Sequence, residues 1–126
     1  MPLDIPALPA TGQTIRIARA AWDVSRDGGL VGLIPIPSQQ VPAGSRVLAV
    51  AYDTTTPFVD LVSSTFAVYL GSTPVSQALD PVATPAGQDW TSQVLLPILD
   101  GSFPLSVVVA GTGYSAGACN IFVFYI

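Results

Sequence analysis

Alternating apolar and polar positions recur along the chain in short segments, and each segment has the period of a β-strand. The first starts at Thr14, runs through Ile15-Arg16-Ile17-Ala18-Arg19 with apolar and charged residues interspersed, and continues past Trp22. Turn signals follow it at 26–29 and recur at 100–101. Further segments of strand character cover residues 30–36, 45–52, 65–70, 91–99, 105–110 and 119–126. The pattern predicts an all-β domain of about seven or eight short strands.

Prolines and glycines modify this pattern in particular places. Pro35 and Pro37 put the end of the second predicted strand at a sheet edge or at a crossing point between sheets. Residues 73–90 are predicted to be a long irregular connection, and residues 111–117 a glycine-rich loop. Residues 45–52 are apolar on both faces, so we expect both faces to be covered. Short strands separated by turns favour a single β-sandwich, with a jelly roll as the expected topology.

The N-terminal residues follow a different rule. Three prolines in the first nine residues fix φ and disfavour helix before them, which predicts an extended arm over residues 1–14. Leu3, Ile5 and Leu8 lie on this arm, which is too short to form a core of its own. We therefore expect the arm to lie against its own sheet or a neighbour, ahead of a β-sandwich domain at 15–126.

Composition excludes several classes of function. The 126 residues suit one domain, and charged residues make up 10% of them, against about 25% in an ordinary soluble domain. The chain has no lysine, glutamate or histidine, so histidine bases, lysine Schiff bases and histidine-bound metals are excluded. A net charge of −4 argues against a nucleic-acid partner, and the 50% hydrophobic content argues against disorder.

The apolar residues do not form a membrane span. No run approaches the roughly 20 residues that a spanning helix needs, and the first residues lack the features of a signal peptide. We therefore expect a soluble protein made in a cytoplasm, with no membrane partner. The single cysteine, Cys119, allows no intrachain disulfide and is expected to be a small buried hydrophobe in the last strand.

So few charges on a small domain suggest that other subunits cover much of its surface. The charges are also unevenly distributed: four arginines and three aspartates give residues 1–46 a net +1, and five aspartates give the remainder −5. Arg16, Arg19 and Arg26 of one subunit are candidates to meet aspartates of another, and ordinary intrachain pairing is the alternative.

Two motifs for hydrolysis are incomplete. Residues 113–117 match the G-x-S-x-G pattern of a nucleophile elbow, which requires a following helix and a histidine base. The nine residues after the motif have strand character, so the segment is interpreted as a hairpin loop. Aspartate pairs can act without histidine, but the Asp-Thr-Gly or Asp-Ser-Gly turn of an aspartic protease is missing. The sequence predicts no catalytic residue, metal site or cofactor.

Aromatic residues are the remaining candidates for ligand binding. A sugar-binding platform would draw on Trp22, Tyr52, Tyr69, Trp90 and Tyr114. In a β-sandwich a tryptophan is more often in the core or an interface, and the position of Trp22 within a strand predicts a core residue. Trp90 follows the proline-rich connection and is the better candidate for a contact.

Three segments together carry a resemblance to a known family. They read VPAGSRVLAV at 41–50, DTTTPF at 53–58 and TFAVYLG at 65–71. This succession of a proline-glycine turn, a strand, a threonine-rich bend and a second strand resembles small β-sandwich virion proteins of tailed bacteriophages. The resemblance covers about 30 residues of the chain and rests on turn chemistry.

The resemblance implies a capsid decoration, or cement, protein with no catalytic activity. Its expected partners are the major capsid protein and further copies of itself in a homotrimer, and its expected place is the capsid surface, after synthesis in the host cytoplasm. The candidate capsid or subunit contacts are Leu3, Ile5, Leu8, Arg16, Arg19, Arg26 and Trp90. The alternatives are a receptor- or glycan-binding module of a phage tail or fibre and, less favoured, an aspartate-based hydrolase.

Overall fold

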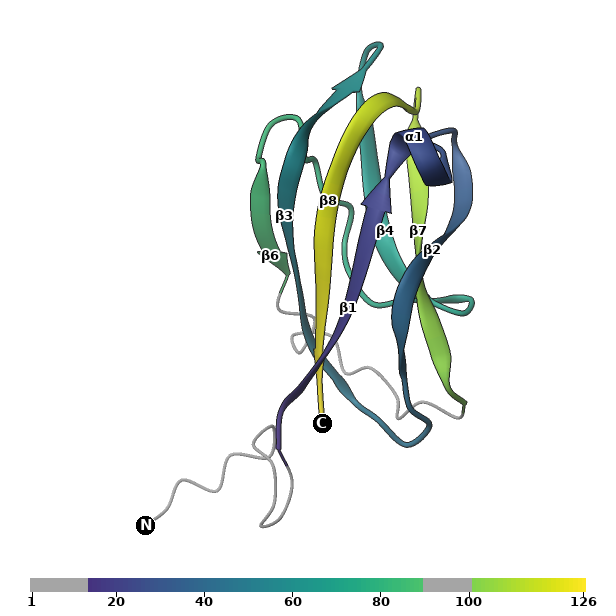
Figure 1. The fold of residues 1–126 in the computed structure, drawn as a ribbon, viewed down its shortest axis with the longest axis vertical. Coiled ribbons are helices and arrows are strands. Elements are labelled where there is room, and N and C mark those ends of the chain that lie inside the picture. Colours follow the sequence, from purple (N-terminus) through teal and green to yellow (C-terminus); the bar gives the residue numbers. More distant parts are fainter. Residues whose placement is uncertain (1–13, 90–100) are drawn as a thin grey trace.

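The computed structural model describes residues 14–89 and 101–126, which form strands and a single helical turn (Figure 1). The elements are β1 (Arg16–Asp23), α1 (Val24–Asp27), β2 (Gly32–Val41), β3 (Val47–Asp60), β4 (Ser64–Leu70), β5 (Thr73–Pro74), β6 (Ala86–Asp89), β7 (Phe103–Gly111) and β8 (Tyr114–Tyr125). Of the predicted arm only Thr14 is described, and the predicted strand at 91–99 lies outside the described residues. None of the described helical structure has the length and apolar character to span a membrane.

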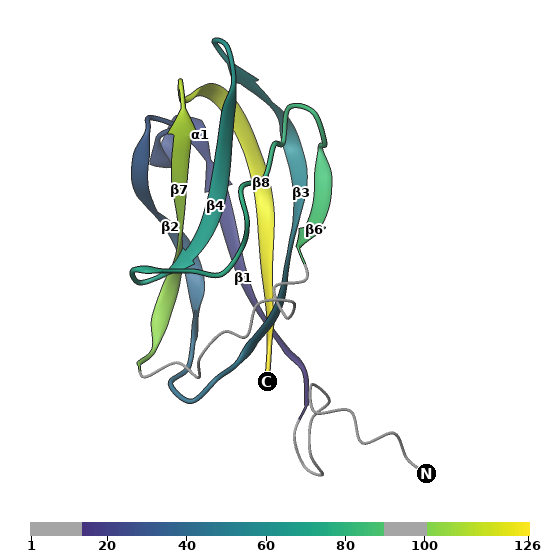
Figure 2. The ribbon, with the colours of Figure 1, turned by 180° about the vertical axis from the view of Figure 1, so that it is seen from behind.

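The strands form two antiparallel layers that face each other. The first layer has the order β1-β8-β3-β6 and the second β2-β7-β4-β5. The layers join where Ala20 of β1 pairs with Ser38 of β2, so the molecule is one eight-stranded sheet curled on itself. In Figure 2 the second layer stands in front and β1 and β8 lie behind it.

The pairing order is nested. β1 pairs with β8, β2 with β7 and β4 with β5, while β3 and β6 are also neighbours, as when a long hairpin is rolled up. The predicted all-β, sandwich-like fold is confirmed. The strand order is consistent with the expected jelly roll, which consists of two interlocked Greek keys.

An aromatic cluster fills the core between the layers. The Trp22 ring lies 5.1 Å from Phe58, 5.3 Å from Phe66 and 5.7 Å from Tyr114, measured between centroids, with tilted or edge-on geometry. Such pairs stabilise a core beyond the area that they bury. Trp22 is 1% exposed, and its indole N–H donates to the carbonyl of Gly28 at 2.9 Å. The prediction that Trp22 is a core residue is confirmed.

Proline placement in β2 follows the prediction. The register of β2 against β7 shifts between Pro35 and Gln40, and within this interval Ser38 pairs with β1 instead. Proline lacks the N–H that a ladder requires, so it favours the position where a strand leaves one partner for another. Pro35 and Pro37 therefore mark the predicted crossing between layers.

Several predicted boundaries were wrong. β3 continues to Asp60, well beyond the predicted end at 52, because register shifts between Thr54 and Asp60 erase the alternation that marks a strand. The supposed loop at 111–117 is a two-residue turn, since β8 already begins at Tyr114. The outer face of 45–52 is only partly covered, as the half-buried Leu48 shows. The helical turn α1 was not predicted, and the connection at 73–90 contains β5 and β6.

A substitution at Gly117 tests how closely β8 packs against the Phe58 ring. Gly117 has φ +137° and faces the Phe58 ring so closely that a Cβ would overlap it, whereas Gly44 has φ +83° and open space around it. Gly44→Ala should lower the free energy of unfolding by about 1–2 kcal/mol through backbone strain alone. Gly117→Ala should lower it by roughly 2 kcal/mol more through overpacking. Urea unfolding measures both, and equal losses would contradict the close packing against Phe58.

Candidate functional site

Three loops meet at one end of the sandwich, the upper end in Figure 1. They are residues 28–31 between α1 and β2, residues 61–63 between β3 and β4, and the turn at 112–113 between β7 and β8. This end lies opposite the described start and end of the chain. Loops grouped in this way on a rigid scaffold are a common place for binding residues.

Hydrogen bonds hold the three loops together. The N–H of Tyr114 donates to the carbonyl of Gly29 at 2.7 Å, which ties the 112–113 turn to the 28–31 loop. The N–H of Thr112 donates to the carbonyl of Ser63 at 3.2 Å, which ties the same turn to the 61–63 loop. The Ser64 hydroxyl, which is buried, donates to the carbonyl of Gly113 at 3.0 Å. The 112–113 turn therefore bridges the other two loops.

Two of these loops, 28–31 and 61–63, carry four exposed aliphatic side chains. Leu61 is 84% exposed, Val62 82%, Leu30 80% and Val31 58%. We call these four residues the apical patch. Grouped exposed aliphatic side chains of this kind mark interaction surfaces, because they gain nothing from contact with water.

Charged side chains beside the apical patch are already engaged. The Asp60 carboxylate accepts a hydrogen bond from the N–H of Ser64 at 2.9 Å. The guanidinium of Arg26 pairs with the Asp27 carboxylate at 2.8 Å, and this contact lowers the pKa of Asp27. The patch therefore offers an aliphatic, largely uncharged surface to a partner.

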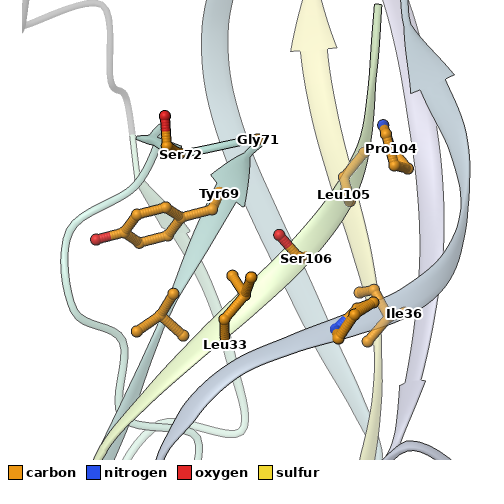
Figure 3. Close-up of a pocket in the computed structure, with 10 residues that line it drawn as sticks. Leu33, Ile36, Tyr69, Gly71, Ser72, Pro104, Leu105 and Ser106 are labelled. Carbon is orange, nitrogen blue, oxygen red and sulfur yellow. The ribbon is translucent and has the colours of Figure 1, made fainter.

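A second apolar surface lies on the outer face of the second layer. A groove of about 560 Å³ crosses β2, β7 and β4 there, and Figure 3 shows Leu33, Ser106 and Tyr69 on these three strands. Pro35, Ser106 and Tyr69 form one row across the three strands by direct pairing. None of the residues that line this groove is charged: Leu33, Pro35, Ile36, Tyr69, Gly71, Ser72, Pro104, Leu105, Ser106 and Val108. We call it the back groove.

Three of the seven predicted contact residues are described, and none of these three lines the back groove. Leu3, Ile5, Leu8 and Trp90 lie outside the described residues. Arg16 and Arg19 are exposed on β1, and the Arg19 guanidinium lies 5.8 Å from the centroid of the Phe122 ring. Arg26 makes the intrachain pairing that the sequence left as the alternative, with its neighbour Asp27.

The structure separates the aromatic candidates. Trp22, Tyr52 and Tyr114 are at most 4% exposed, so they are core residues and form no sugar platform. Tyr69 is half-buried on the wall of the back groove. Ser115, the serine of the G-x-S-x-G motif, is exposed within β8, which continues as a strand where an elbow needs a helix. Across the described residues, no cluster of acidic residues and cysteine could hold a metal ion.

The apical patch was missed by the sequence analysis. Periodicity finds apolar residues that alternate within a strand, and Leu61 and Val62 stand next to each other between strands. The available signal was their position: an adjacent leucine and valine followed by two serines, in a segment too short for a buried strand.

A comparison with solved structures found chains of similar fold in two phage capsid structures. A chain of the acidic stable capsid structure of Helicobacter pylori bacteriophage KHP30 superposes with a TM-score of 0.62 at 12% identity, covering 90% of this chain and 87% of that one. A chain of the cyanophage Pam1 capsid asymmetric unit superposes with a TM-score of 0.63 at 17% identity, covering 99% and 98%. No protein-family model matched, and the search of curated proteins found no match. The expected resemblance to phage virion proteins is thus confirmed at the level of fold.

Burial raises the pKa values of three side chains in the first layer. Desolvation raises the pKa of the Cys119 thiol to about 12, and Cys119 is 2% exposed in β8, which confirms it as a buried hydrophobe. Desolvation also raises the pKa values of Tyr52 and Tyr114 above their ordinary value. The Tyr114 hydroxyl is buried and makes no hydrogen bond to the described residues.

These raised pKa values predict a loss of stability in alkali. Above about pH 9 the Cys119 thiol ionises in the unfolded chain and keeps its proton in the folded chain, so the free energy of unfolding falls as pH rises towards 12. Each such group contributes a slope of up to about 1.4 kcal/mol per pH unit. Urea unfolding at several pH values measures the slope. Cys119→Ala should flatten it between pH 9 and 10, and an unchanged slope would contradict the buried-thiol assignment.

Proposed function

We propose that this protein decorates and stabilises the capsid of a tailed bacteriophage by binding the major capsid protein through apolar surfaces on the outside of the particle. The apical patch carries this proposal, because it is an exposed aliphatic surface held rigidly on an all-β body. The fold shared with chains of two phage capsid structures supports it. The proposed role requires no catalytic group and no cofactor.

Aliphatic contacts suit this role energetically. Fully burying one leucine or valine side chain contributes about 1.5–3 kcal/mol, so the apical patch of one chain supports a contact of modest strength. A homotrimer at a local threefold position presents several copies of the patch at once. Because a second contact then forms at high effective concentration, release of one patch is opposed by the others.

The rigidity of the apical loops favours binding as well. A partner that docks on mobile loops must order them, and this ordering weakens association. Here the bridging turn at 112–113 already fixes both neighbouring loops in the free protein. Burying Leu30, Leu61 and Val62 against a partner therefore requires little further ordering of these loops.

The alternative function is a receptor- or glycan-binding module of a tail or fibre. Glycan sites rely on exposed aromatic faces, but three of the five candidate aromatics are buried. Tyr69 and Trp90 remain, the former in the back groove and the latter outside the described residues. The candidate contacts at Arg16, Arg19 and Trp90 remain part of the proposal, and no observation favours the glycan function over decoration.

Removing the apical patch should weaken binding to the particle. In the variant Leu61→Ser/Val62→Ser, two exposed aliphatic contacts are lost, and occupancy on purified particles should fall by at least about tenfold at limiting protein. The melting temperature should change little because neither side chain is buried. Cosedimentation with particles that lack the protein measures the occupancy.

Val82→Ser is the matched control. Val82 is 46% exposed but lies on the 80–85 loop beside β3, outside the apical patch. This variant should bind normally. Full occupancy by the Leu61→Ser/Val62→Ser variant would contradict the proposed docking face, and glycan binding by the unaltered chain would favour the alternative.

Deleting residues 1–10 tests the arm separately. If the arm reaches a neighbouring subunit, its loss should weaken capsid binding, because fewer contacts then act together. The domain should stay folded, because residues between 18 and 125 of the described strands already pack into a continuous hydrophobic core. Occupancy on particles and the thermal unfolding curve measure the two effects, and unchanged occupancy would exclude a role for the arm.

A further inference from the structure

We propose that the back groove receives the proline-rich segment of residues 2–9 from a second copy of this chain. The proposal rests on the proposed function, which needs several copies acting together, and it names the contact that joins them. The groove has a volume of about 560 Å³, within the range of sites that bind small ligands.

The chemistry of the groove fits a proline-rich segment. Segments in the polyproline II conformation dock in grooves lined by aromatic and apolar side chains. Tyr69 supplies an aromatic wall, and Leu33 and Val108 supply apolar contacts on the neighbouring strands. The hydroxyls of Ser72 and Ser106 lie among these residues and suit the backbone carbonyls of a segment that makes no internal hydrogen bonds (Figure 3).

The chemistry of the segment fits the groove in turn. Residues 2–9 read PLDIPALP, which contains Pro-Ala-Leu-Pro at 6–9, a P-x-x-P spacing. In polyproline II, residues three apart lie on the same side, so Pro6 and Pro9 would face one wall together. The segment carries one charge, at Asp4, and the groove carries none, so docking buries no unpaired charge if Asp4 stays at the rim.

Length and direction favour a second copy. The residues before Thr14 span up to about 40 Å when extended, enough to reach a neighbouring molecule. The described chain leaves the domain through β1 of the first layer, and the back groove opens on the outer face of the second layer. Both views show β1 beginning at the end of the sandwich where the described chain also ends, and β1 belongs to the layer opposite β2, β7 and β4 (Figures 1 and 2).

Cysteine pairing tests the proposal in purified protein without capsid. One full-length variant carries Ala7→Cys in the segment, and an affinity-tagged second variant carries Ser72→Cys at the exposed rim of the groove. Neither substitution removes a proline or large apolar side chain. The two are coexpressed and mildly oxidised, and the tagged fraction is analysed by mass spectrometry. Native Cys119 does not interfere because it is buried.

We expect a disulfide between position 7 of one chain and position 72 of another, in at least about tenfold greater yield than with Ser115→Cys as the acceptor. Ser115 is exposed in β8 and lies outside the groove, so it measures chance collisions. Adding Tyr69→Ala to the tagged chain should lower the yield by about tenfold, the loss expected for one large apolar contact.

Two results would overturn the proposal. The first is a yield no higher than that of the Ser115→Cys control. The second is a disulfide that forms only within the double variant Ala7→Cys/Ser72→Cys, which would place the segment in the groove of its own chain. Because no capsid is present, neither result bears on the proposal that the apical patch docks on the capsid. Conversely, normal occupancy by the Leu61→Ser/Val62→Ser variant would contradict capsid docking through the apical patch, and it would not bear on the contact between the segment and the back groove.

Discussion

The indole of Trp22 is the contact on which the rest of the structure depends. Its ring touches aromatic side chains from both layers, and its N–H holds the carbonyl of Gly28 at the start of the 28–31 loop. The same loop accepts a hydrogen bond from Tyr114, which is itself packed against the Trp22 ring. The packing of Trp22 in the core therefore also fixes the position of the 28–31 loop. This loop carries the exposed side chains of Leu30 and Val31.

The sequence predicted the fold class because alternation reports on burial wherever one face of a strand meets a core. Trp22 and Cys119 are placed correctly for this reason. The same signal fails in the second half of β3, where register shifts bring neighbouring residues to unpredicted faces. The signal also fails at Leu61 and Val62, because exposed aliphatic residues in a turn do not produce the apolar–polar alternation that marks a strand. The candidate docking surfaces became visible only when the topology brought loops from distant parts of the chain together.

The scarcity of charge has a structural counterpart in the described residues. The back groove is lined entirely by uncharged residues, and at the apical end the carboxylates of Asp27 and Asp60 are already bound by neighbouring groups. A protein surface of this kind favours apolar association, which salt screens little. Pairing between the arginines of one subunit and the aspartates of another, suggested by their separation in the sequence, finds no support at Arg26, which is bound to its own neighbour.

The antiparallel pairing of β1 with β8 has a mechanical consequence. Arg16 pairs with Tyr125 at the lower end of the sandwich, and Asp23 pairs with Ala118 near the apex, so the ladder runs the length of the molecule. If the N-terminal segment is held by a neighbour and the apex by the capsid, tension passes lengthwise along β1. Such a load shears all the hydrogen bonds of the ladder at once, whereas a pull on both ends at the lower edge would break them one after another. If both proposed contacts form, the load would therefore lie along the direction in which the β1–β8 ladder resists it best.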